Sequence, residues 1–469
     1  MYCIMTGTKS IESIESIESI ESIESIESIE SIESMESMES KKSKKCKEGI
    51  DSMKGREGKD GMNSSKGKTG VSFFYILFFV AFAQLLASCK AVTTDSPEIA
   101  VQKKTVLFYM AANNNLSGNI LSNINSIRNS KLTSDDNLVI YSHLSGKNPV
   151  LIRVSPNGGE TAVDTLYKFP SATVSANSTT LKNVLSIVQT LCPAEKYGLV
   201  LSSHGTGWLP SGFYSNPTGY PSSSVAAMSL NAPDPYAHMV KSFGSETDAD
   251  GTSLVEMEIT DMAKAIPYKL EFILFDVCLM SNIEVLYELK DVTDYFIASP
   301  AEVLASGFPY TDIVGYMYED VVNAKGIAEA YYNHYNRQSG AYRSATIGAF
   351  KTDGLNDVAA AAKTIFEKKR DNILSLNRSS IQRYYRLNKH WFYDFENYME
   401  VLSGGGEDFT ALKQALDKVT IYKNATENFI NIKIERTCGI SSYITEENTV
   451  LTAAYKKLAW NKDVQMIAD

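Results

Sequence analysis

A histidine and a cysteine stand where two apolar, strand-like segments end. His204 follows residues 197–203, and Cys278 follows residues 271–275, with Asp276 and one valine between. Open α/β sheets carry their functional groups at the carboxyl ends of strands, so the two side chains would meet if these strands were neighbours. A cysteine nucleophile needs a nearby imidazole to take its proton or to hold it in an ion pair. The pattern therefore favours thiol-dependent hydrolysis.

The peptide groups beside this pair could stabilise an oxyanion. Gly205 lets a substrate carbonyl approach the backbone, and its N–H and that of Cys278 could point at the developing negative charge. Cys278 also begins a predicted helix, whose N-terminal dipole would lower the pKa of the thiol. Spacing alone leaves a structural role open, because cysteine is among the most buried residue types and His-Gly is common in turns.

The joint pattern resembles the clostripain family, the C11-type cysteine peptidases of the caspase-like clan. The motifs are Ser-His-Gly-x-Gly-Trp at residues 203–208 and Asp-x-Cys-Leu-Met-x-x-x-Glu at residues 276–284, and the resemblance runs from about Thr105 to Tyr310. It implies a caspase-like αβα sandwich and a His/Cys dyad with no obligatory third member. It also implies protein or peptide substrates that are cut after arginine or lysine.

The resemblance also assigns roles to individual residues. His204 would be the general base and acid, Cys278 the nucleophile, and Asp276 an acidic floor of the S1 pocket, where a carboxylate can pair with a guanidinium or ammonium group. An alternative for Asp276 is a helix N-cap. Glu302 is the single acid of the loop 301–310, where family members carry further acid. Glu302 is the second candidate for substrate binding. Because the loop has no other acid, the expected preference for arginine or lysine rests mainly on Asp276.

A long insert separates the two motifs. Between Trp208 and Ile259, Lys241 is the only lysine or arginine, and the resemblance implies that a basic-specific enzyme could cut itself there. The alternative is a solvated lysine. Residues 246–251 match the first half of an EF-hand loop, but Met257 stands where the last glutamate ligand belongs, so we expect a polar turn and no metal site. The sequence establishes no cofactor. Calcium is a candidate only because the resemblance implies it, since members of the family can depend on calcium.

The first ninety residues read as a leader. A repeat of Ile-Glu-Ser and a lysine-rich stretch fill residues 1–61, which we interpret as translated upstream sequence rather than as a disordered tail. Residues 62–89 have the order of a lipoprotein signal peptide: lysines, an apolar run and the lipobox Leu-Ala-Ser-Cys. We expect Cys89 to carry the lipid and to tether the protein, outside the cytoplasm, to a bacterial membrane. A transmembrane anchor or a buried helix is the alternative.

Composition narrows the classes further. The 469 residues carry a formal net charge of −10, which argues against nucleic acid as a partner. The six cysteines include no Cys-x-x-Cys pair, which disfavours zinc ribbons, and they are too few for a disulfide scaffold. The other histidines have no partner at metal spacing, and His143, after an apolar strand, is expected to be structural. We expect a monomer.

Alternating strands and helices predict the fold class. Strands are expected at residues 105–111, 137–143, 149–154, 197–203, 271–275 and 295–298, and helices at 116–128, 179–191, 259–266 and 280–289. Apolar strands alternating with helices indicate an α/β fold with a mostly parallel sheet. The predicted organisation is a tether at 90–102, a peptidase domain at 103–350 and a smaller, mainly helical region at 351–469. That last region has helices at 355–369, 379–386 and 409–416 and strands at 429–434 and 440–444.

Two other function classes fit the same sequence. One is a catalytically silent binding lipoprotein that keeps the fold, and the other is a thiol amidase of small substrates. The intact His204 and Cys278 favour an endopeptidase over the silent protein. Labelling of Cys278 and a panel of P1 residues separate the three.

Overall fold

A computed structural model of the chain describes residues 99–130, 136–157, 160–214, 236, 239–241, 246–247, 254–386, 391–446 and 449–468. All of them belong to the compact unit Asp95–Asp469. The predictions for the repeat at 1–61, the signal peptide at 62–89 and the lipid on Cys89 lie outside the described residues. No helix in this described part is long and apolar enough to span a bilayer.

A nine-stranded sheet runs through the molecule in the order β14-β12-β10-β9-β5-β1-β2-β3-β4. The central strands β10, β9, β5, β1 and β2 are parallel, and the two strands at each edge run antiparallel to their neighbours. The strands are β1 Gln102–Ala112, β2 Asp136–Leu144, β3 Val150–Asn157, β4 Glu160–Lys168, β5 Ala194–Ser202, β9 Leu270–Asp276, β10 Thr293–Ala298, β12 Thr346–Lys351 and β14 Thr420–Ala425.

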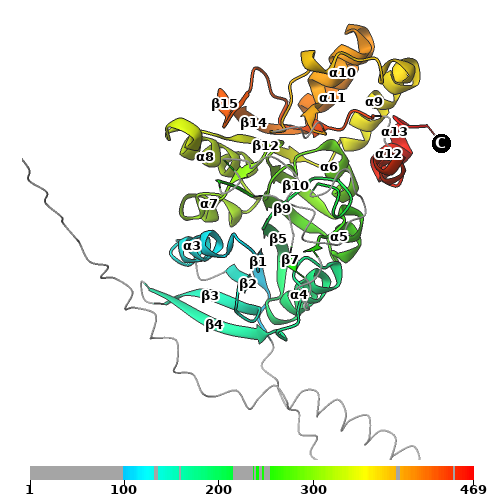
Figure 1. Cartoon of the computed structure of the whole chain (residues 1–469). Helices are drawn as coiled ribbons and strands as arrows, with labels where there is room; N and C mark the ends of the chain where they lie inside the picture. Colours follow the sequence, from blue (N-terminus) through cyan, green and yellow to red (C-terminus); the bar gives the residue numbers. More distant parts are fainter. Residues whose placement is uncertain are drawn as a thin grey trace, which may run out of the picture. The chain divides into compact units, whose positions relative to one another are not determined.

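Helices cover both faces of this sheet (Figure 1). One face carries α3 Ser117–Arg128, α7 Tyr310–Met317 and α8 Ala324–Asn336, and the other carries α4 Ser178–Leu191, α5 Ile259–Ala265 and α6 Ile283–Leu289. All seven residues of β9 are buried, as a strand covered on both sides requires. The predicted αβα sandwich with a mostly parallel sheet is confirmed.

The chain after β12 is mainly helical, and it also returns to the sheet. Its helices are α9 Leu355–Lys369, α10 Phe395–Ser403, α11 Gly406–Val419, α12 Thr449–Tyr455 and α13 Ala459–Val464. Strand β14 pairs with β12 and forms the outer edge of the main sheet. The helix predicted at 379–386 is absent: a single 3-10 turn, Arg378–Ser380, precedes extended chain in which Arg383 bridges Tyr393. The predicted strands at 429–434 and 440–444 are shorter, at β15 Asn428–Phe429, β16 Ile432–Lys433 and β17 Ser441–Ser442.

Candidate active site

The register of two neighbouring strands places His204 and Cys278 at the same end of the sheet, just after the carboxyl ends of these strands. Strands β5 and β9 are parallel, and Ser202 is the partner of Asp276 in the last pair. His204 and Cys278 each stand two residues beyond that pair. Neighbouring strands lie about 4.8 Å apart, so the two residues leave the sheet side by side. Both are buried, with 6% of His204 and none of Cys278 exposed.

Backbone groups of a short strand surround the Cys278 sulfur. The N–H of Val303 donates to Sγ at 3.1 Å, and the Val303 carbonyl lies 3.6 Å from the same atom. Val303 belongs to β11, Val303–Leu304. An N–H donor stabilises negative charge on sulfur, which is the form of cysteine that acts as a nucleophile.

A strained turn follows the cysteine. Leu279 has a φ of 60°, a left-handed conformation that costs a bulky residue about 1–3 kcal/mol. Its N–H donates to the Ala301 carbonyl at 2.8 Å, and its carbonyl accepts from the Asn282 side chain at 2.5 Å. Because of this turn, α6 begins only at Ile283. The prediction that Cys278 begins a helix, with a dipole that lowers its pKa, is therefore wrong.

The loop after His204 packs directly on this turn. Gly207 has a φ of 65°, and a Cβ there would lie 2.6 Å from Asn282 Nδ2 and 2.8 Å from the Leu279 carbonyl. Only glycine fits such a position without displacing the neighbouring backbone. Gly205, the other glycine of the motif, is buried one residue after His204. The glycines of the histidine motif thus allow the two reactive loops to lie in contact.

Glu284 ties the helix after Cys278 to the C-terminal region. This fully buried carboxyl accepts from the Tyr443 N–H at 3.0 Å, the Ser442 hydroxyl at 3.0 Å and the Tyr455 hydroxyl at 2.8 Å. Burial raises the pKa of Glu284 to about 7, against hydrogen bonds that lower it. The Trp208 ring packs on the same two tyrosines, 5.0 and 4.9 Å from their ring centres. Glu284 is the last residue of the cysteine motif at residues 276–284, and the sequence alone indicated no role for it.

Asn115 is a residue that sequence reasoning missed. It lies in the loop between β1 and α3, and its Oδ1 is 2.6 Å from His204 Nε2. Ser203, the residue before His204, donates its hydroxyl to the Ala111 carbonyl at 2.6 Å. This bond fixes the loop that carries His204 to the end of β1. The only signal in the sequence is the run of three asparagines at residues 113–115, which is typical of a loop or a helix cap.

Asp276 is fully buried at the end of β9. Its Oδ2 accepts from the Ser202 hydroxyl at 2.8 Å and from the Tyr310 hydroxyl at 2.7 Å. Burial, and then the charge of Asp276, raise the pKa of Tyr310 well above its ordinary value, so this phenol stays a donor. The N-cap of α6 is Asn282, so Asp276 has no capping role there.

Glu302, the second acid proposed for substrate binding, is paired inside the protein. Arg386 approaches it with two nitrogens: Nε contacts Oε2, and Nη2 lies 3.0 Å from Oε1. Both side chains are buried, with 3% and 6% exposed. A bidentate guanidinium compensates the charge of the carboxylate.

The main chain of Lys241 lies next to β11, the strand whose backbone contacts Cys278. Strand β6, Val240–Lys241, is antiparallel to β11, with Lys241 opposite Val303. Val303 is the residue whose N–H contacts the cysteine sulfur. The structure therefore brings the backbone of a third predicted residue, Lys241, next to the residue that contacts the Cys278 sulfur.

The stretch that resembles half an EF-hand is used differently. Glu246, in β7 Glu246–Thr247, is buried, and its carboxylate accepts from the N–H groups of Ser175 and Ala176 and contacts His143 Nδ1 at 2.8 Å. His143 thus has the structural role that was predicted. Among the residues that the structure describes, no three His, Cys, Asp or Glu side chains form a group that could hold a metal. Asp248 and Asp250 lie outside them.

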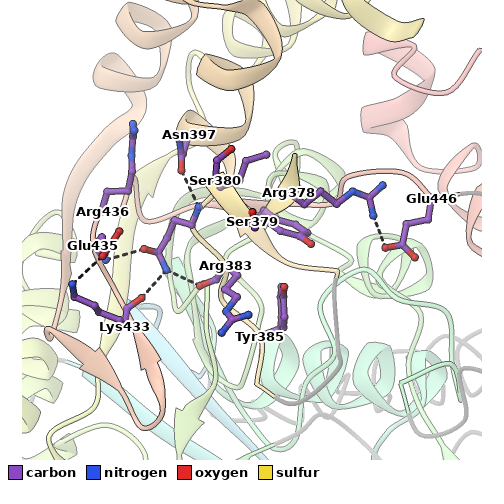
Figure 2. A pocket seen from close by; sticks show the side chains of 13 residues that line it. Arg378, Ser379, Ser380, Arg383, Tyr385, Asn397, Lys433, Glu435, Arg436 and Glu446 are labelled. Carbon is purple, nitrogen blue, oxygen red and sulfur yellow. Dashed lines mark hydrogen bonds and ion pairs between the residues drawn. The ribbon is translucent and has the colours of Figure 1, made fainter. Parts of the chain in front are cut away.

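A polar cleft of about 710 Å³ lies elsewhere, between residues 378–385, α10 and residues 433–436 (Figure 2). Its charges are largely paired: Arg378 contacts Glu446 at 2.5 Å, and Lys433 contacts Glu435 at 2.9 Å. Neither His204 nor Cys278 lines it. The cleft is therefore not the site formed by the two motifs.

Comparisons with known proteins agree with this geometry. The model of the clostripain family matches residues 108–220 and 238–468. Among solved structures, an inactive zymogen of a C11 protease from Parabacteroides distasonis has 32% sequence identity over 78% of this chain and 99% of that chain, with a TM-score of 0.65. A secreted C11 cysteine protease from Bacteroides thetaiotaomicron has 26% identity over 78% of this chain and 99% of that chain, with a TM-score of 0.64. A complex of such a protease from that organism with an irreversible peptide inhibitor has 26% identity over 77% and 98%, with a TM-score of 0.62. A search of curated proteins finds no match.

Proposed function

This chain belongs to the clostripain family of cysteine peptidases, and we propose that it is an endopeptidase in which Cys278 is the nucleophile and His204 transfers the protons. The observation that carries this proposal is the Ser202–Asp276 register pair, which aligns the ends of β5 and β9. In this proposal, a thiol and an imidazole that each stand two residues beyond that pair would have the proximity that nucleophilic catalysis requires.

The reaction follows from these groups. The Cys278 thiolate attacks the scissile carbonyl carbon, and the carbonyl oxygen becomes an oxyanion that the N–H groups of Gly205 and Cys278 can stabilise. Protonated His204 then donates its proton to the leaving amine as the C–N bond breaks, which leaves a thioester on Cys278. Water attacks that thioester while His204 takes its proton. The C–S bond then breaks, so the carboxylic acid product departs and Cys278 is left as the thiolate beside protonated His204.

Specificity for arginine or lysine rests on Asp276 in this proposal. The hydroxyls of Ser202 and Tyr310 both donate to Oδ2, which fixes the orientation of the carboxylate. A carboxylate can form a charge-assisted hydrogen bond with a cationic P1 side chain, and a neutral side chain lacks this attraction. Glu302 contributes less, because Arg386 already compensates its charge.

Self-cleavage after Lys241 is the proposed maturation step. Three facts support it: the Lys241 backbone pairs with Val303, Val303 contacts the Cys278 sulfur, and no part of Cys278 is exposed while β6 is in place. An extended peptide that pairs with a strand edge is a common mode of substrate binding. The Parabacteroides distasonis relative is itself described as an inactive zymogen. Cleavage would release one end of β6 and open the edge of β11 to substrates.

Attachment outside the cytoplasm through a lipid on Cys89 belongs to the same proposal and rests on the sequence of residues 62–89. Incorporation of labelled palmitate by cells that express the full chain, and its loss in Cys89→Ala, would test it. We also propose that the mature enzyme is a monomer, which its mass in solution would check.

A panel of fluorogenic peptides with Arg, Lys, Leu or Asp at P1 tests the proposed function. We expect turnover of the Arg and Lys peptides only. Turnover of neutral peptides alone would contradict the basic specificity. Turnover of none, with Cys278 inert to alkylation after processing, would favour the silent binding protein, and turnover of small amides alone would favour a thiol amidase.

A further inference from the structure

The loop that joins β1 to α3 brings the side-chain amide of Asn115 to the Nε2 atom of the His204 ring. Asn115 Oδ1 lies 2.6 Å from His204 Nε2, although 89 residues separate the two in the sequence. In this orientation of the amide its oxygen faces the ring, and because an amide oxygen only accepts a hydrogen bond, Nε2 is the nitrogen that carries the hydrogen. In the neutral ring, Nδ1 is then the nitrogen that can accept a proton.

The loop is held in a way that keeps this acceptor in place. On one side, Asn113 Nδ2 donates to the buried Glu246 carboxylate at 3.2 Å. In the middle, the Asn114 carbonyl accepts from the Ser145 hydroxyl at 3.0 Å, and Asn114 Oδ1 accepts from the Leu116 N–H at 2.9 Å. Asn115 therefore meets His204 from a loop whose neighbouring side chains are already hydrogen-bonded elsewhere.

We propose that Asn115 is a positioning residue of the dyad: it orients the His204 ring, selects the tautomer with hydrogen on Nε2, and so leaves Nδ1 to exchange the proton with Cys278. The inference rests on the proposed function. Because an amide oxygen accepts from Nε2 in both the neutral and the protonated ring, the bond persists through the whole cycle. It is stronger when the ring is charged, so it also stabilises the imidazolium that must protonate the leaving amine.

This role makes two variants differ in a way that a purely structural contact would not. Asn115→Ala removes the acceptor, so we expect kcat to fall about tenfold with little change in KM, the size of effect expected for one hydrogen bond to a charged group. Asn115→Asp keeps an acceptor of the same shape, so we expect kcat to recover to within about threefold of the wild type.

The pH profile gives a second readout. The loss of kcat/KM at high pH reports the deprotonation of His204. A carboxylate at position 115 favours the imidazolium, so Asn115→Asp shifts this loss to higher pH, and Asn115→Ala shifts it to lower pH. Opposite shifts from two substitutions at one position are not expected from a change in loop packing alone.

The experiment measures kcat, KM and the pH profile with the peptide that the processed wild-type enzyme cuts fastest. Asn114→Ala is the matched control, because its side chain accepts from the Leu116 N–H within the loop and not from His204. If Asn115→Ala matches the wild type in kcat and pH profile, the role of Asn115 is overturned, and so it is if Asn114→Ala loses as much activity as Asn115→Ala. If His204→Ala or Cys278→Ala retains activity, the dyad itself fails, which separates the two outcomes.

Discussion

Ser202 donates its hydroxyl to the carboxylate of Asp276 at 2.8 Å, across the last pair between β5 and β9. This bond joins the two strands at their last pair, two residues before His204 and Cys278. It also fixes the orientation of Asp276, the carboxylate proposed to bind the P1 side chain. One contact therefore links the alignment of the proposed dyad to the proposed P1 preference.

Asp276→Asn should change the specificity more than the fold. The amide oxygen can still accept from Ser202 and Tyr310, but the negative charge is gone. We expect kcat/KM for peptides with Arg or Lys at P1 to fall about 100-fold, because the cation would lose its countercharge in a buried pocket.

The matched measurement uses a peptide with Leu at P1, whose kcat/KM should stay the same or rise. An unchanged ratio between the basic and the neutral peptides would exclude Asp276 as the source of selectivity.

Lys241→Gln should block self-cleavage, because it removes the cation that Asp276 would bind while keeping a polar side chain only one atom shorter. Lys241→Arg is the conservative partner and should still be cut. Electrophoresis of the purified chain with N-terminal sequencing of the fragments checks both, and the expected new terminus of the wild type is Ser242. If Lys241→Gln produces the same terminus at the same rate, the processing site lies elsewhere or another protease makes the cut.

Glu284 should make the stability of the protein fall as the pH rises. Burial raises its pKa to about 7 in the folded state, whereas an unfolded glutamate has a pKa of about 4.3. The folded state therefore binds more protons between these values. The stability that the neutral carboxyl gives is complete below the unfolded pKa and is lost as the pH rises through 7.

Glu284→Gln removes this dependence and keeps an acceptor for Tyr443, Ser442 and Tyr455. Between pH 5 and pH 8, we expect the wild type to lose about 2 to 3 kcal/mol more unfolding free energy than the variant. Urea unfolding at the two pH values measures the difference. Parallel pH dependence in both proteins would mean that Glu284 is ionised in the folded state.

Much of the central fold could be predicted from the sequence. The runs at 105–111, 197–203 and 271–275 are mostly apolar, because the strands they form are covered on both faces, and this is the easiest kind of strand to recognise. The edge strands were harder. Residues 160–168 and 420–425, which form β4 and β14, mix polar and apolar residues. The described residues of both strands are half-buried or exposed, and neither strand was predicted.

The segment 379–386 shows how tertiary contacts override a local pattern. Its spacing favoured a helix, but the Tyr384 N–H donates to the Phe392 carbonyl at 2.8 Å, and Arg383 bridges Tyr393. These partners come from the chain beyond it. No pattern within the segment could indicate them.

The candidate site divides in the same way. His204, Cys278 and Asp276 could be found because each follows a strand and belongs to a motif. Asn115 and the Arg386–Glu302 pair could not, because each contact joins loops that are more than eighty residues apart in the sequence. The strained Leu279 was also hidden, since leucine at that position looked like the start of a helix.

The rate of peptide hydrolysis by Cys278→Ala, compared with the wild type, tests the central claim most directly. Cys192→Ala is the matched control, because burial raises the pKa of the Cys192 thiol to about 11 and makes it unreactive. Cys278→Ala should lose at least about a thousandfold in kcat, as nucleophile replacements do, while Cys192→Ala stays close to the wild type. If Cys278→Ala retains a tenth or more of the wild-type rate, Cys278 is not the nucleophile, and the account of this site is contradicted.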